Sequence, residues 1–333
     1  AQCAQAVAEA KLKEGGEVNF YRPEREAQVL RKVIERNKGP LAGEEIARLF
    51  REIMSACLAL EQPMRVAYFG PAGSYTHAAA VKHFGHSVKP VPHRAIDEVF
   101  RDVEAGNSYY GVVPVENSTE GVVNHTLDML LNSPLRVCGE VELRIHLCLL
   151  SKDKEFGKIT KIYAHQQALA QCREWLDETF KEVPREAVSN NAEAARMASQ
   201  EPGAAAIASS TAAEIYDLNI LAANIEDEPD NTTRFLIIGK QSPPPSGHDK
   251  TTLLLSTPNR SGALARLLVP LADAGVSMTR IESRPSRRGM WDYVFFVDVE
   301  GHADEPAVKE ALEGLKEETV MLKNLGSYPV AVL

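Results

Sequence analysis

Two short polar segments of this chain carry side chains that together could catalyse an elimination. The segment Asn231–Phe235 contains Thr233, whose hydroxyl can give a proton, and Arg234, whose guanidinium can hold a carboxylate. The segment Pro114–Ser118 supplies further polar groups to complete a pocket. Such a set needs no metal or cofactor when the product is aromatic, because the thermodynamic drive then lies in the substrate. Few reactions need so little, and an elimination that forms an aromatic ring is one of them.

These segments border predicted strands, and so does a third loop. Gly70–Thr76 follows an apolar strand and opens a helix, so its backbone N–H groups and the hydroxyls of Ser74 and Thr76 can face an anion. Glu116–Ser118 follows a second strand, and open α/β sheets place ligands at the carboxyl ends of their strands. Each segment also has a plain structural interpretation: a turn with a helix cap for the two loops, and a strand start with a surface arginine for 233–235.

The composition and net charge exclude some classes of binding partner. The 333 residues include 37 Lys plus Arg against 46 Asp plus Glu, a formal charge of −9, which argues against nucleic acid or an anionic membrane as the main partner. Because we find neither a long uncharged apolar run nor a basic leader, we expect a cytoplasmic protein. The five cysteines are scattered and predict small core residues, and the histidines are too scattered for a metal site.

The helices and strands that must position these residues fall into blocks that differ in the spacing of their apolar side chains. Residues 1 to 62 show apolar side chains at three and four residue spacing, which predicts helices that break at Gly15-Gly16 and at Lys38-Gly39-Pro40. A dimerising helical hairpin is the plain interpretation of this block. Polar residues on the inner face, among them Lys11, Arg25 and Glu61, leave open a site where the helices meet.

After Pro63 strands alternate with helices, which predicts βαβ units with parallel sheet and room for two α/β lobes with a cleft between them. The proline-rich stretch Ser242–Asp249 predicts a stiff linker. Beyond it the order strand, helix, strand, strand, helix, strand indicates a ferredoxin-like α+β domain. We expect domains at 1–63, 64–240 and 250–333, with 241–249 as the linker.

The motif regions 66–84, 111–130 and 231–239 resemble those of prephenate dehydratases in type and order. The resemblance implies a two-lobed, periplasmic-binding-protein-like fold and conversion of prephenate to phenylpyruvate, with loss of water and carbon dioxide and no cofactor. It implies that Thr233 protonates the departing ring hydroxyl and that Arg234 holds a substrate carboxylate. It places Glu116, Asn117 and Gln167 with Thr233 among the catalytic residues. It places Phe235, Ser118, Ser74 and Thr76 with Arg234 at the substrate. The usual proline before that glutamine is Gln166 here.

The head of the chain is similar to the helical chorismate mutase domain that many bacteria fuse to this enzyme. The resemblance places Lys11, Arg25, Glu26 and Glu61 at the mutase site, with Cys57 and Glu61 where some members carry serine and glutamine. The family's first helix begins earlier and brings two further arginines. We therefore expect a truncated domain that is inactive or very weak.

The tail resembles the ACT regulatory domain of the same enzymes, which implies inhibition by phenylalanine and a homodimer or homotetramer. The implied phenylalanine site comprises Gly262, Ala263, Leu264, Glu282, Ser283, Arg284 and Pro285. A simple dimerisation module is the alternative for this domain. Two other functions stay open for the whole chain. One is arogenate dehydratase, and the other is a non-catalytic binding or sensor protein, because two-lobed α/β folds often close on ligands without turnover.

Overall fold

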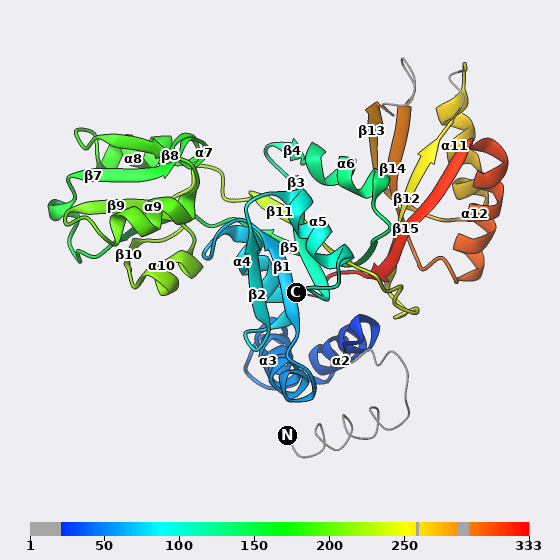
Figure 1. The fold of residues 1–333 in the computed structure, drawn as a ribbon, viewed down its shortest axis with the longest axis horizontal. Coiled ribbons are helices and arrows are strands. Elements are labelled where there is room, and N and C mark those ends of the chain that lie inside the picture. Colours follow the sequence, from blue (N-terminus) through cyan, green and yellow to red (C-terminus); the bar gives the residue numbers. More distant parts are fainter. Residues whose placement is uncertain (1–20, 258–259, 286–292, 333) are drawn as a thin grey trace.

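The structure is a computed structural model that describes residues 21–257, 260–285 and 293–332. These residues form four parts: a helical hairpin, two α/β lobes and a C-terminal domain (Figure 1). The first lobe lies in the middle and contacts each of the other three parts. No helix within the described ranges is long and apolar enough to cross a membrane.

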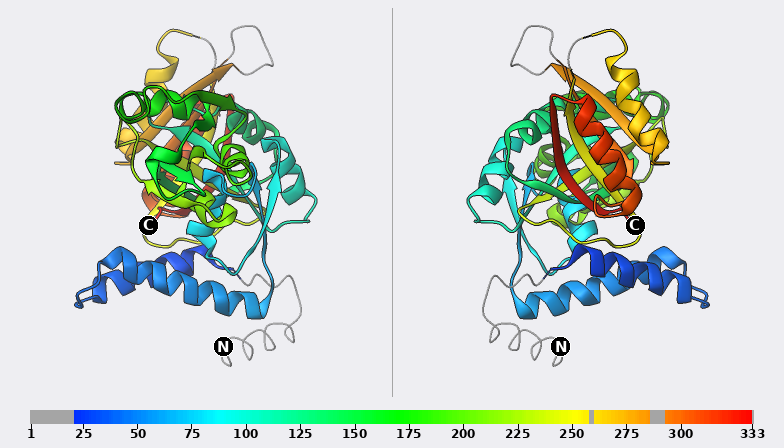
Figure 2. Two further views of the ribbon diagram at one scale, coloured as in Figure 1. Left: turned by 90° about the vertical axis from the view of Figure 1, so that its left-hand side faces the viewer. Right: turned by 90° about the vertical axis from the view of Figure 1, so that its right-hand side faces the viewer.

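The helical hairpin consists of α2 (Pro23–Arg36) and α3 (Gly43–Glu61). Pro23 occupies the first turn of α2, where a missing N–H costs no hydrogen bond, and Gly39-Pro40 follows its end. Leu30 and Ala47 are fully buried, so the hairpin closes on an apolar seam. It lies across one end of the first lobe (Figure 2). The predicted helix over residues 1 to 14, and Lys11 with it, falls outside the described residues.

The first lobe is a mixed sheet with helices on both faces. Its strand order is β2-β1-β3-β11-β5, with β4 paired to β3. The strands are β1 (Arg65–Phe69), β2 (Lys89–His93), β3 (Tyr110–Asn117), β4 (Gly121–Val122), β5 (Arg136–Arg144) and β11 (Thr232–Gly239), and the helices are α4 (Tyr75–Phe84), α5 (Ile96–Glu104) and α6 (Asn124–Asn132). The expected parallel sheet holds only for β1 with β2 and β3. Strand β11 runs antiparallel to both neighbours, because the chain re-enters this sheet from the second lobe.

The second lobe repeats the alternation of strands and helices. Its sheet has the order β10-β6-β9-β7-β8 and is again only partly parallel. Its elements are β6 (Cys148–Ser151), a 3₁₀ turn (Phe156–Lys158), β7 (Lys161–His165), α7 (Gln166–Gln171), α8 (Arg173–Thr179), β8 (Arg185–Val188), α9 (Asn191–Ala198), β9 (Ala204–Ala208), α10 (Ser210–Tyr216) and β10 (Asn219–Ala222). The chain passes between the lobes twice, from β5 to β6 and from β10 to β11. This confirms the predicted two-lobed α/β architecture.

The C-terminal domain has the predicted βαββαβ order and a four-stranded antiparallel sheet, β13-β14-β12-β15. Its elements are β12 (Asp249–Ser256), α11 (Ala263–Asp273), β13 (Met278–Pro285), β14 (Tyr293–Glu300), α12 (Pro306–Glu318) and β15 (Met321–Pro329). The two helices cover one face of the sheet. The other face packs on the first lobe, where Phe296 and Tyr328 share a core with Val113 and Leu236. The domain is therefore docked by apolar burial as well as by the polar contacts described below.

The predicted linker is held in place by both of its neighbours. Arg31 of α2 donates hydrogen bonds to the carbonyl oxygens of Ser246 (3.3 Å) and His248 (2.8 Å). The imidazole Nε2 of His302 lies 3.0 Å from the carbonyl oxygen of Pro243. The stretch thus joins the hairpin to the C-terminal domain as well as joining the lobe to that domain.

Candidate active site

The hydroxyl of Thr233 and the amide of Asn117 meet at the end of the first lobe's sheet. The two residues are directly opposite across β11 and β3. Asn117 Nδ2 donates to Thr233 Oγ1 at 2.8 Å and to Asn231 Oδ1 at 2.7 Å, while its Oδ1 accepts from the backbone N–H groups of Thr119 and Glu120. These four bonds fix the orientation of the amide. The Thr233 oxygen accepts from Asn117, so the hydroxyl proton can be donated to another acceptor.

Ser118 ties the loop after β3 to the start of β11. Its backbone N–H donates to the carbonyl of Thr232 at 2.9 Å, and the N–H of Thr232 donates to Ser118 Oγ at 2.9 Å. Ser118 is exposed, and Asn231 beside it is buried. The two polar segments singled out from the sequence therefore form one hydrogen-bonded unit. Asn231 was not among the predicted site residues, although it lies two residues before Thr233 and thus on the same side of an extended chain.

Arg234 is placed differently from the expectation that it holds a substrate carboxylate. Its guanidinium bonds Glu140 of β5 at 2.8 Å, Asp298 of β14 at 2.6 Å and the hydroxyl of Tyr328 at 3.0 Å. Burial alone would lower the pKa of Arg234, but Tyr328, Asp298 and Glu140 outweigh it and raise that pKa. Lys250 adds a second cation at 2.8 Å from Glu140. The arginine is thus committed to the contact with the C-terminal domain.

The side chains of Glu116 and Phe235 contact other parts of the molecule than the Asn117–Thr233 pair. Glu116 forms an ion pair of 2.8 Å with Arg280 of β13. Phe235 is 1% exposed and packs with Tyr68 and Val112 in the core on the α4 side of the sheet. The expected contact of Phe235 with substrate is therefore not what this structure shows, because its ring fills a closed core.

The loop 70–74 has the geometry of a helix cap. Ser74 Oγ accepts from the backbone N–H of His77 at 3.2 Å, and Thr76 is only 5% exposed. The loop also contacts the second lobe, where Ser209 Oγ donates to the Gly73 carbonyl at 3.0 Å. A Cβ on Gly73 would lie 3.2 Å from Ala212, and the positive φ of Gly73 also favours glycine. This loop is therefore a point where the lobes touch.

Gln167 comes from the second lobe. It stands in the first turn of α7, directly after β7, and is half-buried. The catalytic set expected from the sequence is thus divided between the lobes, with Thr233 and Asn117 on one and Gln167 on the other.

The predicted mutase residues of the described chain gather between α2 and α3. The residues that line a hollow of about 290 Å³ include Arg25, Glu26, Cys57 and Glu61, together with Phe84 of α4. The helices therefore bring together the residues that periodicity left as a possible site.

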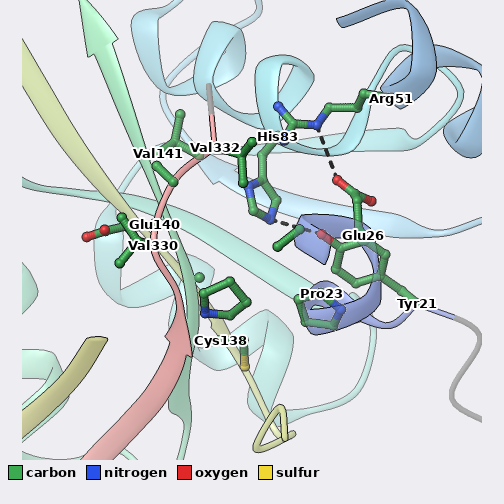
Figure 3. Close-up of a pocket in the computed structure, with 14 residues that line it drawn as sticks. Tyr21, Pro23, Glu26, Arg51, His83, Cys138, Glu140, Val141, Val330 and Val332 are labelled. Atoms are coloured by element: carbon green, nitrogen blue, oxygen red, sulfur yellow. Dashed lines mark hydrogen bonds and ion pairs between the residues drawn. The ribbon is translucent and has the colours of Figure 1, made fainter. Parts of the chain in front are cut away.

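A second, smaller hollow lies where the hairpin meets the first lobe (Figure 3). Arg51 Nε is 3.2 Å from Glu26, and the Tyr21 hydroxyl is 3.1 Å from His83 Nε2. Burial raises the pKa of Glu26 to about 7 although Arg51 opposes the shift. Burial, with Arg51, lowers the pKa of His83 to about 3. Tyr21, Arg51 and His83 were not singled out from the sequence, because only the docking of two distant segments buries them.

The predicted effector residues divide between two faces of the C-terminal domain. Gly262, with φ +74°, precedes the first turn of α11, and Leu264 in that turn is 44% exposed. Ser283 is exposed as well. The guanidinium of Arg284 instead faces the first lobe, where it bonds Asn124 Oδ1 at 2.7 Å and Asp128 at 2.8 Å. Arg284 is therefore engaged in a contact between domains rather than directed toward a free effector site.

No group of three or more His, Cys, Asp and Glu side chains converges as a metal site would require, within the ranges that the structure describes.

Three family models match successive parts of the chain. Chorismate mutase type II matches residues 1–62, prephenate dehydratase matches 66–243, and the ACT domain matches 251–317. The mutase match shows that the first segment is such a domain, so the description of it as clearly truncated does not stand.

Comparison with whole proteins leads to the same family. A bifunctional chorismate mutase/prephenate dehydratase of Pseudomonas aeruginosa is 58% identical over 337 aligned positions, which cover 100% of this chain and 92% of the relative. A prephenate dehydratase of Arthrobacter aurescens, solved in complex with L-Phe, is 34% identical with a TM-score of 0.73, over 80% of this chain and 90% of that one. A solved structure described as a novel type of quorum quenching acylase, GqqA, is 31% identical with a TM-score of 0.75, over 80% of this chain and 98% of its own.

Proposed function

Because the chain belongs to the family of bifunctional chorismate mutase/prephenate dehydratases, we propose that it converts prephenate to phenylpyruvate at the Asn117–Thr233 pair. The observation that carries the proposal is the 2.8 Å bond that orients the Thr233 hydroxyl. The family assignment supports this reaction, and the geometry supports Thr233 as the group that transfers the proton.

The reaction needs one proton to be given at the right place. Thr233 donates its proton to the departing ring hydroxyl, which leaves as water. The electron pair of the bond to the ring carboxylate moves into the ring, carbon dioxide is released, and the ring becomes aromatic. Threonine then regains a proton from water. A hydroxyl is a weak acid, so the rate depends on holding substrate and donor in line, which is the work of Asn117.

Binding of the substrate's two carboxylates is assigned to groups other than Arg234. The guanidinium of Arg234 already has three partners across the domain contact. Ser118 and Ser74 supply hydroxyl donors from loops of the first lobe, and Gln167 supplies an amide donor from α7 of the second. A closing cleft that brings these loops together would surround the substrate with neutral donors and backbone N–H groups.

Phenylalanine is proposed as the effector, bound by the C-terminal domain. The solved relative in complex with L-Phe supports this ligand, and the exposed Leu264 and Ser283 supply apolar and polar contacts for it. We further propose a homo-oligomer in which these surfaces pair, and a cytoplasmic location. The proposed domain bounds are 1–63, 64–240 and 250–333, with 241–249 as the linker. We expected the mutase activity of the 1–63 segment to be absent or very weak; the comparisons do not support this expectation, and an assay with chorismate tests it.

The experiment is phenylpyruvate formation by the full chain, with prephenate and arogenate in separate reactions and with added phenylalanine. Turnover of prephenate that phenylalanine suppresses is the expected result. Preferential turnover of arogenate would change the substrate and keep the chemistry. Binding of either compound without product would refute the enzyme assignment and favour a sensor.

A further inference from the structure

The edge strand β13 faces the first lobe with alternate residues. Arg280, Glu282 and Arg284 are half-buried, while Ile281 and Ser283 between them are exposed. This is the period of two expected of a strand that covers another surface with one side only. The predicted effector motif 282–285 therefore lies on a strand that contacts the lobe carrying Thr233 through Arg284, while its Ser283 is exposed.

The two arginines on that side hold the two ends of one loop. Arg280 forms the 2.8 Å ion pair with Glu116, the residue before Asn117. Arg284, four residues further along, bonds Asn124 at 2.7 Å and Asp128 at 2.8 Å in the first turns of α6. The intervening segment 117–123 contains the loop that orients the Asn117 amide. Figure 1 shows α6 between this loop and the C-terminal sheet.

A β-bulge turns Glu116 toward the C-terminal domain. Phe235 is paired with Pro114 and Arg234 with Glu116, so one residue of β3 has no opposite partner on β11. The extra residue reverses the side on which the following side chain projects, as bulges beside active sites often do. Glu116 and Arg234 consequently both reach the C-terminal domain, whereas the next pair along the ladder is Asn117 with Thr233.

Apolar and charged side chains both line the contact between the first lobe and the C-terminal domain. Arg280 and Arg234 line the same narrow gap between the domains, together with Asp298. The Arg280 side chain is 11% exposed and that of Glu116 is 38% exposed. Because Glu116 keeps contact with water, its ion pair with Arg280 adds little to stability. Its consequence is geometric, since it fixes the backbone one residue from Asn117.

We propose that Arg280 is a positioning residue for the dehydratase reaction. Through Glu116, and with Arg284 holding the far end of the loop, it sets the position of the 117–123 segment and hence the bond from Asn117 to Thr233. An effector bound against the opposite side of β13 shifts this strand and loosens the loop. This proposal rests on the proposed function, and it gives β13 the role of joining the effector site to the proton donor.

The test compares three variants of the full chain for steady-state turnover of prephenate and for inhibition by phenylalanine. Arg280→Met removes the charge and keeps much of the side-chain length. Arg280→Lys keeps the charge. Arg136→Met is the matched control, because Arg136 also crosses the domain contact, to the Asn324 carbonyl at 3.1 Å, but at the far edge and away from the loop.

We expect Arg280→Met to lower kcat about tenfold or more with KM within about threefold, since a displaced catalytic group loses rate rather than binding. Its phenylalanine inhibition should also be weaker. Arg280→Lys should recover part of kcat, and Arg136→Met should stay within about twofold of the parent. A fourth variant, Asp128→Asn, should lower kcat two- to fivefold by loosening the other end of the loop. Circular dichroism would verify that each variant is folded.

Equal kcat in Arg280→Met and Arg136→Met, with the parent active, would overturn the positioning role and leave the dehydratase assignment intact. A rise in KM alone would do the same, because it would make Arg280 a binding residue. An inactive parent would instead refute the proposed function on which this inference rests.

Discussion

Replacement of Thr233 by valine removes the hydroxyl proton and little else. Valine has nearly the shape of threonine, and Thr233 is half-buried at the start of β11. Asn117 loses one acceptor at 2.8 Å and keeps Asn231 at 2.7 Å. The change in stability is therefore about 1 kcal/mol, the ordinary net value of a hydrogen bond. The loss of a positioned proton donor is larger, roughly 10²- to 10⁴-fold in rate, or about 2.7 to 5.5 kcal/mol of transition-state free energy.

The assay is the rate of phenylpyruvate formation as a function of prephenate concentration. We expect the loss in kcat, with KM within about fivefold, because the proton is transferred only in the transition state. Thr233→Ser retains a hydroxyl and should lose about tenfold or less. Thr232→Val makes the same atomic change one residue earlier and should stay near the parent. An unchanged kcat in Thr233→Val, or an equal loss in Thr232→Val, would refute the assignment of Thr233 as donor.

Three further changes test other parts of the structure. Asn117→Leu should lower kcat by roughly 10- to 100-fold, because it frees the Thr233 hydroxyl from its orienting donor. It should also lower the unfolding temperature, because Asn231, Thr119 and Glu120 lose their bonds to the amide; an unaltered kcat in the folded variant would remove Asn117 from the mechanism. His83→Gln should reduce sensitivity to acid. Folding lowers the pKa of His83 to about 3, so as pH falls below about 6.5 the unfolded chain takes up a proton that the folded chain does not. The free energy of unfolding of the parent should therefore fall by about 1 kcal/mol between pH 6.5 and 5.5, and that of the variant should not. Urea midpoints that change equally with pH in both proteins would contradict this. Gly262→Ala places a Cβ on a residue with φ +74° and should weaken phenylalanine inhibition with turnover within about twofold of the parent, so a parent-like inhibition curve would count against an effector site there.

Much of the fold could be predicted from local pattern. The two-lobed alternation, the βαββαβ tail and the cap at Ser74 all follow from residues close in the sequence. For Thr233 and Asn117, the sequence predicted only that each lies in a polar segment at the end of a strand, and not that their side chains bond each other. The antiparallel return of β11 was not predicted, because it depends on how the second lobe is inserted between β5 and β11.

The side chains whose contacts differ from the sequence-based expectation, Arg234 and Glu116, are held by residues far away in the sequence. Neighbouring side chains of a strand project to opposite faces of the sheet, so the sequence already places Arg234 and Thr233 on different faces. Nothing near either residue in the sequence shows what packs on the face that carries Arg234. The partners of Arg234 on the C-terminal domain, Asp298 and Tyr328, lie 64 and 94 residues away. The bulge that turns Glu116 is visible only in the ladder with β11. Sequence motifs therefore identified the right segment, while tertiary packing decided which of its residues could meet a substrate.

We propose that Thr233 faces the substrate while Arg234 holds the C-terminal domain. The most direct test of this division of roles is the steady-state kinetics of Arg234→Gln with prephenate, measured where circular dichroism shows a folded protein. The structure assigns Arg234 to Glu140 and Asp298 and leaves the substrate to other donors. We therefore predict a KM within about threefold of the parent, together with a lower unfolding temperature, because two buried carboxylates lose a partner. A KM raised by about 10²-fold at unchanged stability would mean that the guanidinium binds a substrate carboxylate, and would contradict the account.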